Sequence, residues 1–380
     1  MAATFWLYSH NFTHSGAPLV LAAIARDLAA AGLRDQLRIV SWGGLHDRRH
    51  SNLHYQLIAE GIKCQVLDPD QPPPRVNSGD RLLLNTIALP DSVILQALAW
   101  LAEGQLERLD WYVHESDPQI WILSDATRSL IRDALMLPGI HMRVPSLHVL
   151  RIYQRWLNYI GNAIAVQCPR VESLDKNLLQ DDDCVCFTDL RLVLVGAVGY
   201  GNKGHLWLLK LVDLALSRIP NDTPGYRSIR LSFLGLETGR FAALARHCVN
   251  YGKNLLESNF YWKDNCPREL LVSELSKSNI LVNCSLKESF SCVSSEALSM
   301  GLLLMRMRNG GFEEQLIPSC TGFDLGNPHP EVFESQLETL QDIRNYAKNS
   351  DSKLANMSSL ARSHGKKFEE ISYIKWLLQD

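Results

Sequence analysis

Two consecutive series of alternating strands and helices constrain this chain more than any other feature of its sequence. In each series, short runs rich in aliphatic, β-branched and aromatic residues are separated by helical stretches, and a polar break lies between the series at 169–190. Strands that alternate with helices form parallel sheets covered by helices. We therefore predict an α/β protein with two Rossmann-like domains facing a central cleft.

The same patterns give the expected boundaries. The strands of the first series are predicted at 4–8, 37–42, 63–67, 81–85, 110–114 and 163–168, and its clearest helix at 18–31. The strands of the second series are predicted at 191–196, 230–235, 259–262, 279–284 and 302–307, and its helices at 205–218, 238–250, 267–277 and 293–300. We place the first domain at 1–185, the second at 186–360, and at 361–380 a terminal helix that packs back on the first domain.

Length and composition exclude several classes of protein. The 380 residues suit two domains rather than one core. No uninterrupted apolar run reaches the roughly 18 residues of a membrane span, and the N-terminus lacks the basic and apolar regions of a signal peptide. The nine cysteines are an odd number without paired spacing, so we expect reduced thiols in a cytoplasmic protein and no zinc site. A net charge of -3 argues against a nucleic-acid binder.

Glycine-containing loops follow the first strand of each series, where ligands of open α/β sheets bind. Gly16, in the loop at 9–18, would let a ligand approach the backbone before the first helix. Gly196 opens the loop at 195–206, which holds three further glycines and Lys203. Free amides and an ammonium group suit a diphosphate, although this loop is neither a Walker loop nor a clean G-x-G-x-x-G. A plain glycine-rich turn is the alternative for both loops.

Two glutamates stand eight residues apart in "KESFSCVSSEALSMG" (287–301). Glu288 lies in the loop after an apolar strand, and Glu296 lies near the start of the following helix. A carboxylate at a helix start suits the vicinal hydroxyls of a ribose. Spacing alone leaves two exposed surface acids as an equal alternative.

Two more strand ends carry candidate groups. His114 and Glu115 follow the strand at 110–114, where His114 could exchange a proton near neutral pH or form a plain hydrogen bond in a loop. The segment "RNGGFEEQL" (308–316) joins a strand to a helix, and capping of that helix by an acid explains its glutamates sufficiently.

The ordered set of these loops resembles the retaining glycosyltransferases of family 4, the "group 1" transferases of the GT-B fold. "ESFSCVSSEALSMG" looks like the E-x7-E motif of that family, and "NGGFEE" resembles the Gly-Gly-x-x-Glu segment one strand later. "VGAVGYGNKG" resembles the Val-Gly-Arg…Lys-Gly loop, and "SGAP" resembles the N-terminal glycine loop. The resemblance extends over most of the chain.

The resemblance implies a role for each matching residue. Glu296 would bind the ribose of a nucleotide, and Glu288 would contact the transferred sugar and brace the reacting centre. The backbone amides of Ser289, Phe290 and Ser291 would contact the diphosphate or the sugar. Lys203 would neutralise leaving-group charge, Gly196 would open the donor loop, Gly16 would let the first domain close on the donor, and His114 would face the donor sugar.

One position departs from the family pattern. Where the family has an arginine directly after Val-Gly, this chain has Ala197. One of two expected cations is therefore missing, and Arg306 or Arg308 are the candidates to replace it. The departure puts activity in doubt without affecting the fold.

The resemblance implies a hexosyltransferase-type enzyme that moves a sugar, with retention, from a nucleotide-diphosphate donor to a glycan or lipid-linked acceptor, in cell-surface polysaccharide synthesis. The nucleotide sugar is then a co-substrate, and no cofactor or metal is expected. The acidic run at 181–183 lies in the linker rather than at a strand end, so we interpret it as solvated charge and not as a metal motif. The alternatives are a sugar-nucleotide epimerase or hydrolase of the same fold and a catalytically silent nucleotide-sugar-binding protein.

The acceptor side is marked by weaker patterns. The segment "HDRRH" (46–50) could bind a lipid phosphate or form a solvated loop. The basic and apolar segment at 147–157 suits either peripheral contact with the cytoplasmic face of a membrane or an amphipathic helix buried at the domain junction. The sequence leaves open the donor sugar and base, the acceptor and linkage, and the oligomeric state.

Overall fold

The computed structural model describes residues 3–13, 16–43, 52–171, 187, 189–197, 201–218, 229–235, 241–264, 266–327, 329, 333–349 and 351–378. The chain forms two compact units. Unit 1 consists of Met1–Arg170 and Ile371–Asp380, and unit 2 consists of Val171–Glu370. The segments at 46–50 and 181–183 lie outside the described residues.

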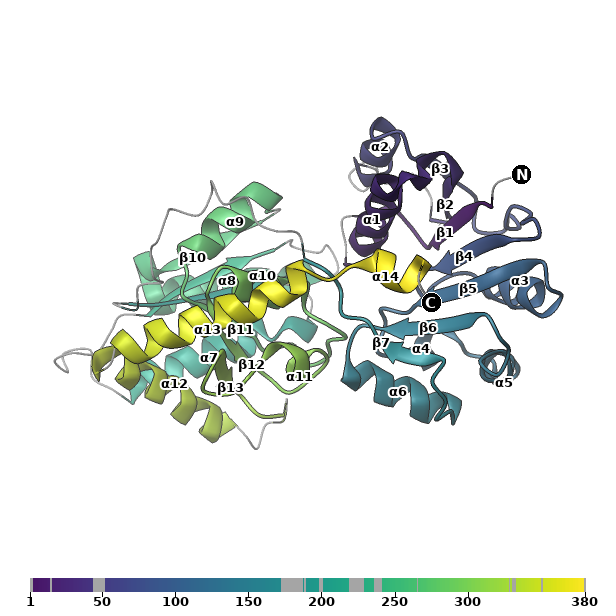
Figure 1. Ribbon diagram of the computed structural model, residues 1–380. Coiled ribbons are helices and arrows are strands. Elements are labelled where there is room, and N and C mark those ends of the chain that lie inside the picture. Colours follow the sequence, from purple (N-terminus) through teal and green to yellow (C-terminus); the bar gives the residue numbers. More distant parts are fainter. Residues whose placement is uncertain are drawn as a thin grey trace. The chain divides into compact units, whose positions relative to one another are not determined.

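Unit 1 is built on a seven-stranded parallel sheet with the strand order β3-β2-β1-β4-β5-β6-β7 (Figure 1). Its strands are β1 (Phe5–Ser9), β2 (Leu37–Ser41), β3 (Lys63–Val66), β4 (Asp80–Leu84), β5 (Leu106–Tyr112), β6 (Ile140–Val144) and β7 (Ile164–Val166). Its helices are α1 (Gly16–Leu28), α2 (Asn52–Ala59), α3 (Asp91–Ala102), α4 (Pro118–Trp121), α5 (Asp125–Ala134), α6 (Leu147–Leu157) and α14 (Tyr373–Leu378). A separate apolar core covers each face of this sheet, because side chains alternate between the faces along each strand.

Unit 2 contains a six-stranded parallel sheet with the order β10-β9-β8-β11-β12-β13. Its strands are β8 (Leu190–Val195), β9 (Ile229–Leu234), β10 (Phe260–Lys263), β11 (Ile280–Asn283), β12 (Leu303–Arg306) and β13 (Gly322–Asp324). Its helices are α7 (His205–Ser217), α8 (Ala242–Leu256), α9 (Arg268–Ser276), α10 (Cys292–Ser299), α11 (Phe312–Gln315), α12 (Phe333–Asn349) and α13 (Asp351–Glu369). The predicted α/β class with two Rossmann-like domains is confirmed.

In both sheets the strand order reverses beside the first strand of the unit. The reversal lies between β1 and β4 in unit 1 and between β8 and β11 in unit 2. Ligands of doubly wound sheets bind at the carboxyl ends of the strands that flank such a point. The fold therefore directs attention to the loops after these strands.

Two strands of unit 1 differ from the sequence prediction. β5 starts at Leu106 rather than at 110, because Arg108 and Asp110 are buried as an ion pair with an Nε–Oδ2 distance of 2.9 Å, which hides the apolar pattern. β6 is additional, and its half-buried His141 and Arg143 hide it in the same way.

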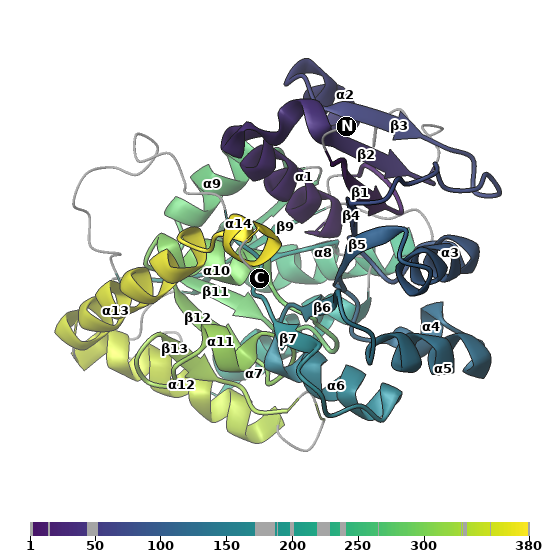
Figure 2. The ribbon, with the colours of Figure 1, turned by 45° about the vertical axis from the view of Figure 1, so that its right-hand side comes forward.

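The end of the chain forms two helices where one terminal helix was expected at 361–380. α13 belongs to unit 2 and packs along α10, where a Cβ on Gly365 would lie 2.2 Å from the backbone nitrogen of Ser299 (Figure 1). α14 belongs to unit 1, where Tyr373, Trp376 and Leu377 are buried in the core beside α1 (Figure 2).

The two crossings between the units lie at 170/171 and 370/371, whereas the sequence placed domain boundaries at 185/186 and 360/361. The backbone nitrogen of Val171 donates to the carbonyl of Phe368 at 3.1 Å, which ties Val171 to the end of α13. The backbone nitrogen of Arg170 donates to the hydroxyl of Tyr373 at 2.7 Å, which ties Arg170 to α14.

The stretch Gly16–Gln36 is the one helical segment among the described residues that is long and apolar enough to cross a membrane. In the structure, α1 supplies eight buried residues to the core of unit 1, from Pro18 to Leu28. Packing against the sheet accounts for the apolar character of this helix.

Candidate functional site

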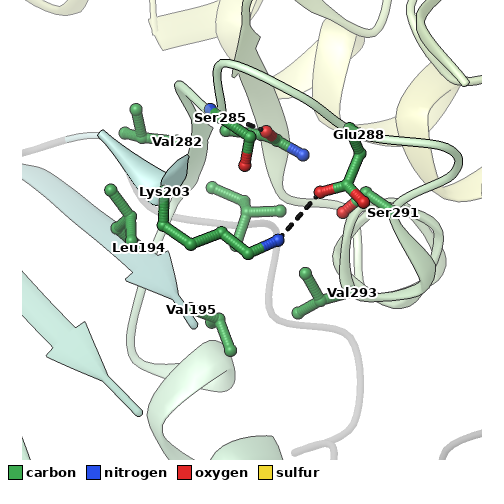
Figure 3. Close-up of a pocket in the computed structure, with 10 residues that line it drawn as sticks. Leu194, Val195, Lys203, Val282, Ser285, Glu288, Ser291 and Val293 are labelled. Atoms are coloured by element: carbon green, nitrogen blue, oxygen red, sulfur yellow. Dashed lines mark hydrogen bonds and ion pairs between the residues drawn. The ribbon is translucent and has the colours of Figure 1, made fainter. Parts of the chain in front are cut away.

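A small pocket of about 20 Å³ opens at the carboxyl ends of β8 and β11 in unit 2 (Figure 3). Its walls come from these two strands, from the loops that follow them and from the start of α10. The lining residues are Leu194, Val195, Lys203, Leu281, Val282, Asn283, Ser285, Glu288, Ser291 and Val293. The pocket thus lies at the point where the strand order reverses. Three of the loop residues singled out in the sequence line it: Lys203, Glu288 and Ser291.

Lys203 and Glu288 face each other across this pocket (Figure 3). The ammonium Nζ of Lys203 lies 3.0 Å from Oε2 of Glu288. The side chain of Lys203 is 28% exposed and that of Glu288 is 13% exposed, so the ion pair remains accessible from solvent. A partly exposed pair of this kind contributes little to stability. It does place one cation and one acceptor at the mouth of a pocket.

Asn202 ties the Lys203 loop to the Glu288 loop. Its side-chain amide donates to the carbonyl of Lys287 at 2.8 Å, and its side-chain oxygen accepts from the backbone nitrogen of Lys287 at 2.8 Å. The backbone nitrogen of Leu286 donates to the carbonyl of Asn202 at 2.7 Å. These three hydrogen bonds fix the distance between two loops that are 85 residues apart in sequence.

Gly204 also permits a close approach between these two loops, at Cys284. Its φ of +73° lies in the left-handed region, and a Cβ there would lie 2.4 Å from the carbonyl oxygen of Cys284. Only glycine therefore fits between Lys203 and the start of α7 at His205.

Glu296 lies on α10 and forms an ion pair with Arg268, the first residue of α9. Nη1 of Arg268 lies 2.7 Å from Oε1 of Glu296, and the two side chains are 38% and 12% exposed. The thiol of Cys292 lies one turn before Glu296. Burial, together with the charges of Glu296 and Glu288, raises the pKa of this thiol to about 12, and Arg268 acts in the opposite direction. Glu288, Glu296 and Arg268 therefore all lie within electrostatic range of the Cys292 thiol.

The Gly-Gly loop after β12 (308–311) packs against the loop that carries Glu288. The backbone nitrogen of Gly310 donates to the carbonyl of Glu288 at 3.1 Å. A Cβ on Gly310 would lie 2.1 Å from that same carbonyl oxygen and 2.5 Å from the carbonyl oxygen of Ser289. Helix capping by an acid, the interpretation made from the sequence, misses the main contact of this segment. The glycines of "NGG" leave room for the loop that carries Glu288 to pack against them.

Arg306 holds the Gly-Gly loop in place. This side chain is fully buried, and its guanidinium donates to Gln315, to the side-chain oxygen of Asn309 at 3.1 Å and to the carbonyl of Gly310. Burial lowers the pKa of Arg306 to about 10, while Glu288 and Glu314 act in the opposite direction. Arg308 forms an ion pair with Asp324 at 2.5 Å. Neither arginine lines the pocket: Arg306 is held inside the Gly-Gly loop, and Arg308 is paired with Asp324.

Side chains of the short segment between the two glutamates cap α10 and pack in the core. Ser291 caps α10, and its Oγ accepts from the backbone nitrogen of Ser294 at 3.3 Å. The ring of Phe290 is buried against Phe368, with ring centroids 5.8 Å apart.

Gly196 directly follows β8 and has a φ of +150°. It packs so closely on the next loop that a Cβ on Gly235 would lie 1.7 Å from the carbonyl oxygen of Gly196.

The predicted residues Gly16 and His114 lie in unit 1, at the carboxyl end of its own sheet. Nε2 of His114 lies 3.1 Å from Oδ1 of Asn85, and Nδ2 of Asn85 donates to the carbonyl of Ala17 at 2.8 Å. Asn85 therefore links the loop after β5 to the start of α1, which begins at Gly16.

The imidazole of His114 is held in its neutral form. Burial and the nearby charge of His10 lower its pKa to about 3. The adjacent carboxyl of Glu115 accepts hydrogen bonds from Thr86, from the backbone nitrogen of Ile87 and from that of His114, and burial raises its pKa against these bonds. A neutral imidazole can donate or accept a hydrogen bond at pH 7, but it holds no second proton to deliver.

Three contributors were not singled out in the sequence: Asn85, Asn202 and Arg268. Asn85 directly follows the apolar run at 82–84, so the rule of polar residues at strand ends could have found it. Asn202 and Arg268 gave no such signal. Asn202 lies inside a loop already assigned to glycine and lysine, and Arg268 opens an ordinary helix.

No protein-family model and no curated protein matches the sequence. Solved structures are similar over nearly the whole chain. HepE of Anabaena in complex with UDP is 15% identical, with a TM-score of 0.75 over 99% of this chain and 98% of that chain. Sucrose-phosphate synthase of Thermosynechococcus elongatus is 14% identical, with a TM-score of 0.67 over 100% and 97%. TarM of S. aureus is 9% identical, with a TM-score of 0.67 over 99% and 99%. The chain has the GT-B fold.

Proposed function

We propose that this protein is a retaining glycosyltransferase of the hexosyl type, which moves a sugar from a nucleotide-diphosphate donor to a glycan or lipid-linked acceptor in cell-surface polysaccharide synthesis. One observation carries the proposal: Lys203 and Glu288 face each other at 3.0 Å in a pocket at the strand-order reversal of unit 2, with Glu296 on the helix that borders it. Support also comes from similar structures, since HepE binds UDP and UDP-glucose and TarM binds UDP with α-GlcNAc-glycerol.

The donor would lie across the pocket with its diphosphate at Lys203. The carboxylate of Glu296 would accept hydrogen bonds from the ribose hydroxyls, and that of Glu288 would accept them from the transferred sugar. The backbone amides of Ser289, Phe290 and Ser291, in the loop before α10, would contact the phosphate or sugar oxygens. His114 would meet the sugar as a neutral hydrogen-bonding group.

Transfer would break the bond between the anomeric carbon and the phosphate oxygen and form a bond from that carbon to an acceptor hydroxyl oxygen. The acceptor proton would pass to the departing diphosphate on the same face of the sugar, so that the configuration is retained. Negative charge grows on the leaving oxygen during this step, and the ammonium of Lys203 would stabilise it there. Such a step needs no base from the protein, and we propose that it needs no cofactor or metal.

A thermal-shift panel of nucleotide sugars tests the proposal first. A ligand that binds the native state raises its apparent stability, so the panel identifies base and sugar together. The best donor is then incubated with a panel of glycan and lipid-phosphate acceptors, and the anomeric configuration of the product is read by NMR. A product of inverted configuration contradicts retention, and the absence of any stabilising nucleotide sugar contradicts the whole proposal.

The same experiment separates the two rival functions. Turnover of the donor without an acceptor would favour a sugar-nucleotide epimerase or hydrolase. Binding of a donor without transfer to any acceptor would favour a catalytically silent binding protein, a reading that rests on Ala197.

We further propose that the protein works on the cytoplasmic side and touches an anionic membrane surface through α6. Leu147, Arg151 and Arg155 are exposed on this helix, and Ile160 just beyond it is 90% exposed, while Val149 and Tyr153 are buried. Basic side chains beside apolar ones suit anionic lipid headgroups. Sedimentation with vesicles of phosphatidylcholine, with and without phosphatidylglycerol, measures this contact. Binding that is equal for both vesicles, or unchanged in an Arg151→Gln/Arg155→Gln variant, contradicts it.

A further inference from the structure

Ala197 leaves the donor loop with one cation, and the charges around the pocket show why a second one is needed. Lys203 is paired with Glu288, and Arg268 is paired with Glu296. These four side chains sum to zero charge. A nucleotide diphosphate brings at least two negative charges, and these two ion pairs do not attract it unless their cations turn from the carboxylates to the ligand.

Arg268 is the partner in its ion pair that is free to turn. Its side chain is 38% exposed, against 12% for Glu296, and it projects from the first position of α9. Arginine has a long side chain whose planar guanidinium matches the geometry of phosphate oxygens. Arg306 also lies near, but its guanidinium is fully buried and is held by Gln315, Asn309 and Gly310, so it contributes charge without contact.

A bound ribose would release Arg268. Two vicinal hydroxyls that donate to one carboxylate use both of its oxygens, and one of these, Oε1 of Glu296, accepts from Arg268 at 2.7 Å in the structure. Oε1 has two lone pairs and can accept from both, but a hydroxyl that shares this oxygen weakens the ion pair and lets Arg268 turn away. Arg268 follows the carboxyl end of β10, and Lys203 follows the carboxyl end of β8 in the same parallel sheet, so both cations lie at one end of that sheet.

We propose that Arg268 is a nucleotide-binding residue that exchanges Glu296 for a phosphate oxygen when the donor binds, and so supplies the cation that Ala197 lacks. This inference rests on the proposed function, because it requires that a nucleoside diphosphate occupies the pocket. Arg268 would then determine specificity. It would raise the affinity for a nucleoside diphosphate, whereas a nucleoside without phosphate would only lose part of its contact with Glu296 to Arg268.

The test compares a nucleoside diphosphate with its own nucleoside by calorimetric titration. The probe is whichever of UDP, GDP, ADP, CDP and dTDP binds the wild-type chain most tightly. In Arg268→Gln we expect affinity for the diphosphate to fall at least tenfold, with affinity for the nucleoside unchanged or higher. Arg268→Lys, which keeps the charge, should recover part of the diphosphate affinity. Arg218→Gln is the matched control, since Arg218 forms a similar arginine–glutamate pair with Glu334 at 2.8 Å on the surface of unit 2.

Each outcome decides the inference. Equal affinities in wild type and Arg268→Gln, or a rise for both ligands together, would overturn it and leave Arg268 as a structural partner of Glu296. In that case the proposed function stands, because the wild-type chain still binds the diphosphate. Failure of the wild-type chain to bind any of the five diphosphates would sink the proposed function itself and this inference with it. An unchanged melting temperature of Arg268→Gln shows that the variant is folded.

Discussion

Gly310 and Gly16 are both glycines, but the space around them differs. The space that a Cβ on Gly310 would need is occupied by the carbonyl oxygens of Glu288 and Ser289, at 2.1 and 2.5 Å. At Gly16, in contrast, no heavy atom of the described residues lies within 4 Å of such a Cβ. The first glycine is required by the protein itself, and any requirement for the second comes from a ligand.

This contrast gives the first prediction. Gly310→Ala should lower the unfolding free energy by about 3 kcal/mol or more, since backbone rather than a flexible side chain must shift. Gly16→Ala should leave the unfolding free energy within about 0.5 kcal/mol of the wild type. Chemical denaturation measures both, and equal losses for the two variants would contradict the packing around Gly310.

Glu296 carries the second prediction. If its carboxylate binds the ribose, Glu296→Ala should weaken nucleotide binding about tenfold or more, because hydrogen bonds to a charged group contribute about 1.5–3 kcal/mol. Titration with the best nucleotide sugar measures the effect, and Glu338→Ala, which removes an exposed glutamate on α12, serves as the control. Unchanged affinity in Glu296→Ala would rule out the ribose role.

At the scale of elements, the site depends on loops that hold one another. The loop at 201–204 contacts 284–288 through Asn202 and Gly204, and 284–288 rests on the Gly-Gly loop at 308–311. Each loop follows a strand of the same sheet, so the sheet sets their positions and the cross-loop hydrogen bonds set their spacing. A pocket formed in this way keeps Lys203 and Glu288 in position without a helix or strand between them.

Asn202 offers a third prediction at this scale. Asn202→Ala removes both side-chain hydrogen bonds to Lys287 and should lower the unfolding free energy by about 1–2 kcal/mol. It should raise the donor KM more than it lowers kcat, since Lys203 is displaced but not removed. Asn254→Ala, at an exposed site on α8, controls for the loss of an amide. Donor KM equal to that of the wild type would show that Lys203 is positioned without this tie.

The strand and helix order was predictable from the sequence because apolar runs and turns alternate so regularly. The start of β5 and the presence of β6 were not predicted. A buried ion pair such as that of Arg108 and Asp110 interrupts the apolar pattern of the sequence, although the two charges neutralise each other in the fold. In the site, Lys203, Glu288 and Ser291 lie on one pocket and Glu296 borders it, as the strand-end rule predicts. Arg268 and Asn202 could not be predicted, because their contacts join segments far apart in the chain and their own neighbourhoods look ordinary.

At the scale of the whole molecule, buried neutral histidines make stability depend on pH. His205 starts α7 beside the ring of Phe233, neither of its ring nitrogens has a hydrogen-bond partner within the described part of the chain, and burial lowers its pKa to about 3. Between pH 6.5 and about 3 the unfolded chain therefore binds a proton that the folded chain does not. Unfolding becomes easier as the pH falls through this window.

The fourth prediction follows from this loss of stability as the pH falls. His205→Leu removes the titrating group, so its loss of unfolding free energy between pH 7 and pH 5 should be about 2 kcal/mol smaller than that of the wild type. At pH 7 the variant should be as stable as the wild type or more so, because two unsatisfied nitrogens are gone. Urea denaturation at both pH values provides the comparison, and equal acid sensitivity of the two proteins would contradict a neutral His205.

The central claim is that a nucleotide-diphosphate sugar binds in unit 2 at the carboxyl ends of β8 and β11. Hydrogen–deuterium exchange with and without the donor found in the thermal-shift panel tests this location most directly. We expect slower exchange in the peptides covering 201–206 and 285–297, and no such protection of these peptides in Lys203→Ala/Glu288→Ala. Protection that falls wholly outside these two segments, or that persists in the double variant, would contradict it.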